Sequence, residues 1–308
     1  MIETTHATAR GLPVPADLGT GEIGGARLAF KQHGTGEPVV FVHGSISDLT
    51  IWELQLAPVG ERYRAIACSR RYAWPNQDLP AGAPDTMQPH VEDLLALLRA
   101  LDANPAHLVG NSFGAFICLR AAIQQPAAVR SLVLEEPPLV PLLIGAPPSP
   151  ARILKSLPHH PLATLGVLRF GAQTLAPVGR LIKAGEIEQS VERFARGVLG
   201  DEAYGRLPEE VRAHIRANAS THVGQFIADG GFEPITEAEI RSVAAPSLIV
   251  IGANSPAFLR RMATPLASLL ANSKSLEVPS ASHAMHLENP TAFNPALLRF
   301  LAGTEGPR

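Results

Sequence analysis

Short apolar runs alternate with segments of helical periodicity over the first 138 residues. Pro38–Val42 is a continuous apolar run, which is typical of a strand buried on both faces of a parallel sheet. Arg64–Cys68, Ala106–Val109 and Val129–Leu134 predict three further buried strands. Pro84–Asp102 predicts a helix, because apolar residues recur in it at helical spacing: Met87, Val91, Leu94, Leu95, Leu98 and Leu101. This alternation predicts an α/β fold with a mostly parallel, doubly wound sheet.

The pattern changes once, over residues 139–239. Strand signals stop there and amphipathic helical segments replace them, notably Val178–Leu199 and Glu209–Ile227. The α/β pattern then resumes, with a strand at Pro246–Gly252, a helix near 256–271, a strand at 275–278 and a helix at 290–301. Ligands of such sheets bind beyond the carboxyl ends of the strands. An insertion that leaves and re-enters at that edge is therefore expected to roof a binding site.

These changes divide the chain into four expected parts: a flexible leader at 1–20, a core domain at 21–138 and 240–308, and a helical cap at 139–239 between its two halves. The leader has no apolar segment typical of a secretion signal, and no later segment offers 18 uninterrupted apolar residues. The only cysteines, Cys68 and Cys118, give no disulfide framework and no metal-binding spacing. We therefore expect a cytoplasmic protein.

Charge is nearly balanced along the chain. There are 26 Lys and Arg residues against 28 Asp and Glu, a net charge of -2, and the basic residues are dispersed. This pattern predicts no nucleic-acid partner and no membrane partner. We expect a small-molecule substrate, with neither a metal nor an organic cofactor. The pattern leaves the oligomeric state open.

One turn carries candidate chemistry, the sequence Gly110-Asn111-Ser112-Phe113-Gly114. It lies between the apolar strand at 106–109 and the apolar helix that starts near Ala115, which is the context of a nucleophile elbow. The two glycines leave room for a turn so tight that Ser112 adopts a strained conformation with its hydroxyl raised above the sheet. The N–H of Phe113 would then face a substrate oxyanion. The pentapeptide also occurs in ordinary Gly-rich turns, and it is the strand and helix around it that favour a nucleophile.

Three motifs now stand in the order of the α/β-hydrolase superfamily: His43-Gly44 after an early strand, the elbow in the middle, and Ser282-His283 near the end. The chain resembles this superfamily over about residues 24–303, and most closely its cap-bearing serine esterases. The resemblance implies the α/β-hydrolase fold with an inserted helical cap. It makes Ser112 the nucleophile and His283 the base, with His286 as a competitor, and it assigns the oxyanion hole to the backbone N–H groups of Ser45 and Phe113. Because epoxide and haloalkane hydrolases of this fold carry an aspartate at the elbow, a serine favours substrates with an acyl carbonyl.

The acid of the triad departs from the family pattern. Most relatives carry an Asp after the strand that corresponds to Ser247–Ile251, whereas no Asp occurs here after Asp229. Some relatives carry the acid after the preceding strand, where this chain has Glu135 and Glu136. Adjacent residues of an extended chain point to opposite sides, so only one of the two is expected to face His283. We choose Glu136 over Glu135, because the proline pair that follows it would rigidify its backbone.

The expected substrate pocket rests on aromatic residues in loops that should face the cleft: Trp52, Tyr72, Trp74 and Phe113. The first hypothesis for function is a serine hydrolase that cleaves a small, fairly apolar carboxylic ester through an acyl-enzyme intermediate. The second is hydrolysis of a carbon–carbon bond in a diketone or dienoate with the same triad, with Arg70 or Arg71 binding the substrate carboxylate. The third is a ligand-binding module on a hydrolase fold, which the irregular acid position favours.

Overall fold

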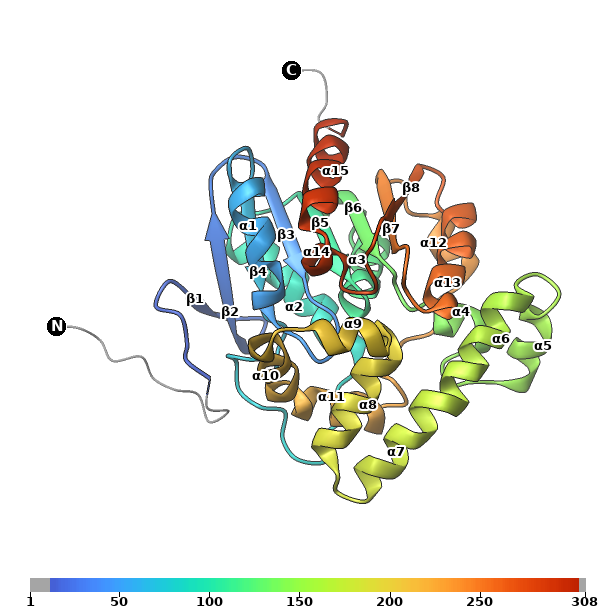
Figure 1. Cartoon of the computed structure of the whole chain (residues 1–308). Helices are drawn as coiled ribbons and strands as arrows, with labels where there is room; N and C mark the ends of the chain where they lie inside the picture. The colour runs from blue at the N-terminus through green and yellow to red at the C-terminus, as the bar shows by residue number, and fades with distance from the viewer. Residues whose placement is uncertain (1–11, 305–308) are drawn as a thin grey trace.

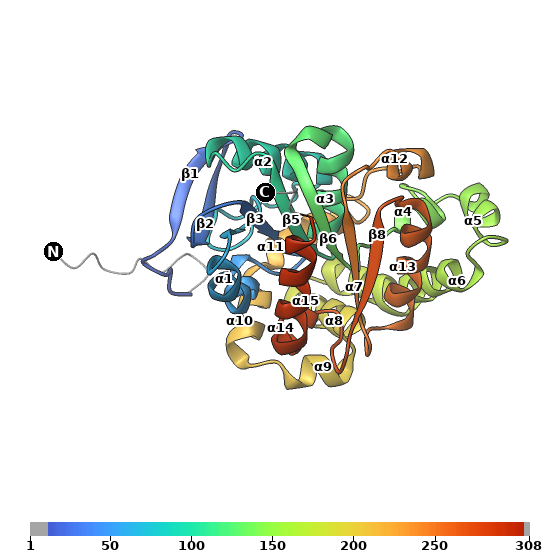
Figure 2. The same ribbon diagram turned by 90° about the horizontal axis from the view of Figure 1, so that it is seen from above.

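A computed structural model describes residues 12–304 and contains one eight-stranded sheet in the order β1-β2-β4-β3-β5-β6-β7-β8 (Figures 1 and 2). The pairs β1–β2 and β2–β4 are antiparallel, and all pairs from β3 to β8 are parallel. The α/β class and the mostly parallel sheet are confirmed. The strands are β1 Gly19–Ile23, β2 Ala26–His33, β3 Pro38–Val42, β4 Arg64–Cys68, β5 Ala106–Asn111, β6 Val129–Glu135, β7 Ser247–Gly252 and β8 Ser273–Val278.

Strand β1 corrects the expected leader at its end. Gly19 and Thr20 pair with Ala29 and Phe30 of β2, so the last two residues of the segment 1–20 belong to the sheet. No strand pattern is visible in the sequence at this point, because the glycines of Gly19-Thr20-Gly21 interrupt any apolar alternation. Residues 1–11 of the expected leader lie outside the described residues.

Helices cover both faces of the sheet, and alternate residues of the central strands face them. In β3, Val40 and Val42 pack with α2 (Met87–Ala100), α3 (Phe113–Gln124) and α13 (Ala257–Leu269). Val39 and Phe41 pack on the other face with α1 (Glu53–Gly60) and α15 (Pro290–Ala302). A continuous apolar run is therefore required, because both faces of the strand are covered. The short elements η1 (Leu49–Trp52), η2 (Pro126–Ala128) and α14 (Met285–Glu288) complete this core.

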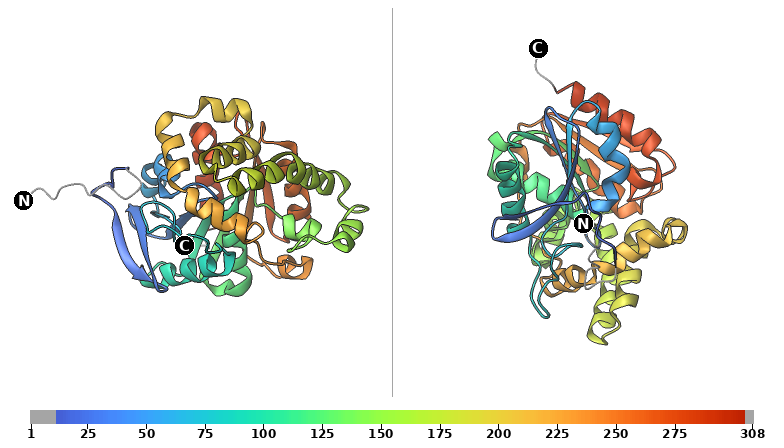
Figure 3. Two further views of the ribbon diagram at one scale, coloured as in Figure 1. Left: turned by 90° about the horizontal axis from the view of Figure 1, so that it is seen from below. Right: turned by 90° about the vertical axis from the view of Figure 1, so that its left-hand side faces the viewer.

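Every regular element between β6 and β7 is helical in this structure: α4 Val140–Ile144, α5 Pro150–Ser156, α6 Pro161–Phe170, a π-helical turn Gly171–Leu175, α7 Ala176–Lys183, α8 Ile187–Leu199, α9 Asp201–Arg206, α10 Glu209–Ala217, α11 Ala219–Ile227 and α12 Glu237–Arg241. Most of them lie across the edge where the strands end, as the view from below shows (Figure 3). The amphipathic segment 178–199 is divided at Gly185, which has a positive φ of 78°. Segment 209–227 is divided at Asn218. No helix within residues 12–304 is both long enough and apolar enough to span a bilayer.

A buried carboxylate joins the inserted helices to the core. Asp48 is fully buried and accepts hydrogen bonds from the side chains of His214 and Asn218, each with a length of 2.9 Å. It also accepts from the backbone N–H and the hydroxyl of Thr50. Asn218 in turn accepts a hydrogen bond from the backbone N–H of Trp74. A buried charge is tolerated only when such donors surround it, so this contact fixes where α10 and α11 lie.

Replacing Asp48 by Asn should lower the free energy of unfolding by about 2 kcal/mol, because an amide cannot accept from all of these donors and hydrogen bonds to a buried charge contribute about 1.5–3 kcal/mol. Urea unfolding monitored by circular dichroism measures the change. Asp78→Asn is the matched control, since exposed Asp78 accepts a hydrogen bond from Ser220 of α11. The control should change stability much less, and equal losses in both variants would contradict the assignment.

The same contact has a pH dependence. Burial acts to lower the pKa of His214, but the hydrogen bond and charge of Asp48 outweigh it and raise that pKa above 6.5. A raised pKa in the folded state stabilises the protein fully below pH 6.5, and this stabilisation is lost as the pH rises through the higher value. The stability difference between the native chain and Asp48→Asn should therefore shrink as the pH rises through the raised pKa of His214.

Candidate active site

Ser112 occupies a strained turn between β5 and α3. Its φ of 52° and ψ of -120° lie in a region that side chains rarely adopt, and such strain is concentrated at functional sites. Two close approaches hold the turn. A Cβ atom at Gly114 would lie 2.2 Å from the Val42 carbonyl oxygen, and one at Gly110 would lie 2.6 Å from backbone atoms of Ala115. Both positions therefore require glycine, as the elbow motif predicts.

The position of Ser112 leaves its hydroxyl available for chemistry. It is the N-cap residue of α3, yet its side chain makes no capping hydrogen bond. Ser112 lines a cavity together with His283, Ser45 and Phe113. The N-terminus of α3 also provides a positive electrostatic potential at this point. The structure thus brings the expected nucleophile, base and oxyanion-hole residues to one cavity.

Glu136 is the carboxylate that contacts His283. Its Oε2 atom lies 2.6 Å from Nδ1 of His283. Its Oε1 atom accepts a hydrogen bond, 3.0 Å long, from the backbone N–H of Gly252. Glu136 and His283 are 1% and 5% exposed, so solvent does not compete for this contact. A carboxylate on Nδ1 fixes the ring so that Nε2 is free to accept the serine proton. Glu136 has a positive φ of 43°, a second strained residue beside the first.

Glu135 contacts the other histidine. Its Oε2 atom lies 2.7 Å from Nδ1 of His286 and accepts a hydrogen bond from the Asn111 amide. The same Asn111 amide donates a hydrogen bond, 3.0 Å long, to the backbone carbonyl of His283. The two adjacent glutamates therefore serve two different histidines, and only Glu136 reaches the one that lines the larger cavity. Glu135 and Asn111 instead hold the loop on which His283 stands.

The loop that carries Ser45, which we call the oxyanion loop, is polarised by hydrogen bonds to the carbonyl oxygen of Gly44. Three groups surround the Gly44 carbonyl oxygen: Nδ1 of His43 at 2.9 Å, Nη2 of Arg70 at 3.0 Å and the Ser47 hydroxyl at 3.2 Å. Nε2 of His43 accepts a hydrogen bond from the backbone N–H of Arg70, so Nδ1 carries the proton and donates. Burial and the charge of Arg70 also hold the pKa of His43 well below its usual value, which keeps the ring neutral. Donors on this carbonyl polarise the Gly44–Ser45 peptide and strengthen the Ser45 N–H as a donor.

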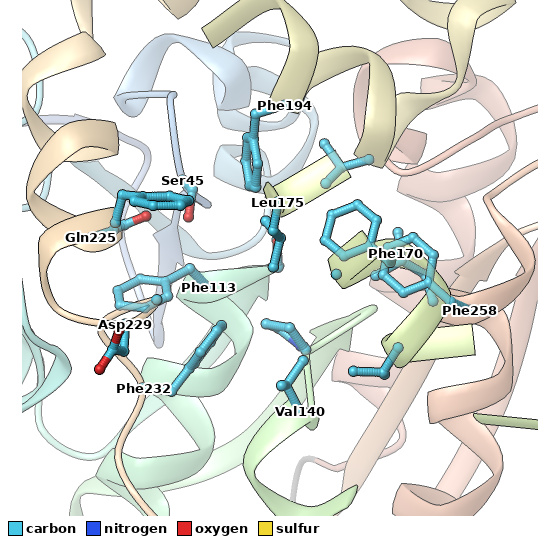
Figure 4. A pocket seen from close by; sticks show the side chains of 18 of the residues that line it. Ser45, Phe113, Val140, Phe170, Leu175, Phe194, Gln225, Asp229, Phe232 and Phe258 are labelled. Atoms are coloured by element: carbon cyan, nitrogen blue, oxygen red, sulfur yellow. The ribbon is translucent and has the colours of Figure 1, made fainter. Parts of the chain in front are cut away.

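The larger cavity has a volume of about 350 Å³ and is mainly apolar (Figure 4). Figure 4 shows two groups of aromatic rings in its wall. Phe170 and Phe258 stack with ring centroids 4.2 Å apart, and Phe113 and Phe232 lie 5.5 Å apart. Other lining residues come mostly from the inserted helices and include Val140, Ile144, Val167, Leu175, Phe194, Val198, His222, Gln225, Phe226 and Asp229. No Lys or Arg is among the described residues that line it.

A smaller cavity of about 70 Å³ meets the larger one at the nucleophile. The two share five lining residues: Ser45, Ser112, Phe194, Val198 and His283. The smaller one extends along the loop and helix that carry the histidine, where Ala284, His286 and Leu287 line it. Ser112 and His283 therefore stand at the junction of a large apolar compartment and a small one beside the His283 loop.

Three predicted pocket residues lie elsewhere. Trp52 is fully buried and stacks on His286 at 4.2 Å, and Trp74 is buried against His214 at 4.6 Å. Tyr72 is not among the residues that line either cavity. The rings of Trp52 and Trp74 turn into the core, because burying an aromatic ring contributes more than leaving it in a cleft. Of the predicted aromatic residues, Phe113 lines the larger cavity.

The two arginines considered for a substrate carboxylate are engaged elsewhere. Arg71 pairs with Asp93 through two hydrogen bonds of 2.6 and 2.5 Å. Arg70 is 4% exposed and donates a hydrogen bond to the Gly44 carbonyl of the oxyanion loop. Neither lines either cavity. Sequence reasoning missed the rings of Phe170, Phe194, Phe232 and Phe258, because apolar residues in amphipathic helices give no signal that separates a cavity wall from a packed core.

No cluster of three or more His, Cys, Asp or Glu side chains placed to bind a metal occurs in the described part of the chain. Cys68 and Cys118 are buried and unpaired, and burial raises the pKa of Cys68 to about 12. These thiols are therefore unreactive at neutral pH. The candidate chemistry of the site rests on Ser112, His283, Glu136 and the oxyanion loop.

Comparison with known proteins adds a family and several relatives. The sequence model of the alpha/beta hydrolase family matches residues 39–296. A Mycobacterium tuberculosis protein named "Putative non-heme bromoperoxidase BpoC" is 26% identical over 309 residues, covering 90% of this chain and 98% of its own. A 2-hydroxy-6-oxo-2,4-heptadienoate hydrolase of Pseudomonas putida is 34% identical over 113 residues, 36% of this chain and 41% of its own. A thermophilic esterase from Thermogutta terrifontis has a similar structure, with a TM-score of 0.74 at 19% identity, covering 94% of this chain and 100% of that chain.

Replacing Glu136 by Gln should lower kcat by about 10³-fold to 10⁴-fold, because the imidazolium formed at His283 loses its buried counter-charge. Glu135→Gln is the matched control, with the same chemical change at the adjacent residue. It should lower kcat by less than about tenfold, since it acts only through the loop of His283. Stopped-flow measurement of acylation on an activated ester compares the two. Equal kcat losses in both variants would refute the assignment of Glu136.

Replacing Ser47 by Ala should lower kcat by about twofold to fivefold, because one of the donors that polarise the Gly44–Ser45 peptide is lost. A purely structural role would not change the affinity for transition-state analogues selectively. A trifluoromethyl ketone, whose tetrahedral adduct places a negatively charged oxygen at the oxyanion hole, should therefore bind Ser47→Ala more weakly by the same factor. Ser190→Ala in α8 removes another hydroxyl that donates to a carbonyl and is the control. An unchanged inhibition constant would contradict the polarisation.

Proposed function

The chain belongs to the α/β-hydrolase family and is a hydrolase enzyme, and on this premise we propose that it cleaves uncharged carboxylic esters through an acyl-enzyme intermediate on Ser112. The observation that carries the proposal is the contact between Glu136 and His283 beside the strained serine. The mainly apolar lining of the larger cavity then limits the substrate. Among the described residues that line this cavity, Asp229 is the only acidic one.

The residues present support each step of the reaction. His283 takes the proton of Ser112 at Nε2 as the hydroxyl attacks the ester carbonyl, and Glu136 stabilises the resulting imidazolium. The N–H groups of Ser45 and Phe113 receive the negative charge that develops on the carbonyl oxygen. His283 then returns the proton to the departing alcohol. Water, activated by the same histidine, attacks the acyl-enzyme and releases the acid.

The two cavities suggest which part of the ester lies where. The departing alcohol must lie within hydrogen-bonding distance of His283, which donates its proton. The smaller cavity extends along the His283 loop, so we assign it to the alcohol, and we assign the larger apolar cavity to the acyl group. Because a liquid water molecule occupies about 30 Å³, the smaller cavity of about 70 Å³ accommodates about two or three non-hydrogen atoms. The favoured substrates are therefore methyl or ethyl esters of a large apolar acid.

Carbon–carbon bond hydrolysis is the rival within enzymes, and the similar Pseudomonas putida hydrolase acts on a dienoate by its name. A dienoate carries a carboxylate, which needs a cationic or strongly donating partner in an apolar cavity. The cavity lining offers no Lys or Arg among the described residues, and Asp229 would repel a carboxylate. A ligand-binding module is the rival outside enzymes. Such a module has no need of a buried carboxylate on the histidine beside a strained serine.

The proposal predicts a crossed chain-length preference. Among esters of one alcohol, kcat/KM should rise from acetate to octanoate as the acyl chain fills the larger cavity, by about 0.8 kcal/mol or fourfold per buried methylene. Among octanoate esters, kcat/KM should fall once the alcohol exceeds ethanol. Hydrolysis of both series, measured by acid release, checks the assignment.

The reverse preference, for short acyl and long alcohol chains, would contradict this assignment and place the alcohol in the larger cavity and the acyl group in the smaller one. A fluorophosphonate probe provides the control for catalysis itself, since it labels only an activated serine. The native chain should be labelled and Ser112→Ala should not. An unlabelled native chain would favour the ligand-binding module.

A further inference from the structure

One segment of the chain contains no acidic residue. Between Pro137 and Gly185 there are 49 residues with no Asp or Glu and five basic residues: Arg152, Lys155, Arg169, Arg180 and Lys183. The rest of the chain then has 26 minus 5, or 21, basic residues against 28 acidic ones. A chain with a net charge of -2 therefore contains one strongly positive segment, which comprises α4, α5, α6 and α7.

The same segment exposes apolar side chains. Of the six large apolar side chains that are strongly exposed among the described residues, four lie on α5 and α6: Leu154 at 70%, Leu162 at 59%, Leu165 at 54% and Leu168 at 36%. The three leucines of α6 recur at intervals of three, so they share one face of the helix. Ala163 and Val167, on the opposite face, are buried. Helix α6 is therefore apolar on both faces, with one face exposed to solvent.

These exposed residues lie on two consecutive helices, and we call them the α5–α6 surface, defined by the four leucines together with Lys155 and Arg169. The two helices project at one end of the molecule, beyond α13 (Figures 1 and 3). Lys155 and Arg169 are exposed, and neither forms an ion pair with a described residue. Next to it, a hollow of about 280 Å³ between α6 and α13 has Arg169 and Arg261 on its rim.

We propose that the α5–α6 surface docks on an anionic lipid surface. Leucines on one helix face, with basic side chains around them, are the composition of helices that lie in the membrane interface: the apolar face enters the acyl boundary and the cations contact the headgroups. The hollow with Arg169 and Arg261 on its rim matches a lipid phosphate. A second copy of the chain fits less well, because an isologous contact would place two acid-free surfaces against each other.

The expectation of no membrane partner rested on the dispersion of Lys and Arg along the chain, whereas the absence of Asp and Glu between Pro137 and Gly185 leaves one segment positive. Docking on lipid goes beyond the proposed function and does not depend on it. The inner face of α6 contributes Val167 and Phe170 to the cavity wall. Docking through the outer face would therefore bring the cavity close to the lipid from which an apolar substrate would come.

Vesicle co-sedimentation of the full chain, without any substrate, tests the proposal. Binding to vesicles of phosphatidylcholine and phosphatidylglycerol should exceed binding to phosphatidylcholine alone by at least about tenfold, and added salt should reduce it. The double variant Leu162→Glu, Leu165→Glu should lose this binding. Leu54→Glu, which changes an equally exposed leucine on α1, should keep it. None of these leucines lines a cavity, so circular dichroism should be unchanged in all three proteins.

Equal binding to neutral and anionic vesicles would overturn the proposal, because the cations would then have no part in docking. Retained binding by the double variant would overturn it as well. Light scattering without lipid measures the oligomeric state and so tests whether a second copy of the chain covers the surface. If the native chain is a dimer and the double variant a monomer, the α5–α6 surface is covered by a second copy and the proposal is wrong.

Discussion

The hydrogen bond between Glu136 and His283, 2.6 Å long and shielded from solvent, is the interaction on which the rest of the site depends. It depends on the register of three neighbouring parallel strands. Asn111 of β5 pairs with Glu135 of β6, and Glu135 pairs with Val250 of β7. The next residues along the chain are Ser112, Glu136 and Ile251, so the register of the parallel sheet places Ser112 and Glu136 side by side. The backbone N–H of Gly252 then holds the second oxygen of Glu136.

Burying two adjacent carboxylates would be strongly unfavourable without partners, because desolvation costs several kcal/mol for each ion. The structure gives each of them a histidine and a second donor. Asn111 connects the two pairs, since its amide reaches both Glu135 and the backbone of His283. Asn111 also precedes the nucleophile directly. The loop of His283 and the turn of Ser112 are therefore joined through one side chain, to which the second glutamate–histidine pair is also hydrogen-bonded.

The sequence predicted the parts of this protein that depend on local patterns. The apolar runs of β3 to β6, the elbow glycines and the choice between two glutamates all follow from short-range constraints such as turn geometry and side-chain alternation. It failed for β1, whose glycines carry no strand pattern, and for Trp52 and Trp74, which turn into the core. It also could not identify the cavity wall. Phe170, Phe194 and Phe232 are brought together by the packing of inserted helices, and helical periodicity shows only that each has an apolar environment.

The contact of a glutamate, and not an aspartate, with His283 has a geometric reason. In most relatives an aspartate after the strand that corresponds to β7 contacts the histidine, whereas here Ser255 stands in that region, buried and with its hydroxyl lacking a partner among the described residues. Moving the acid to β6 displaces its backbone by one strand, about 4.8 Å. Glutamate is longer than aspartate by one methylene, and the backbone of Glu136 has a positive φ of 43°. Its two oxygens contact the backbone N–H of Gly252 at the end of β7 and Nδ1 of His283 in the loop after β8. The longer side chain therefore connects β6 both to the neighbouring strand and to the proposed base.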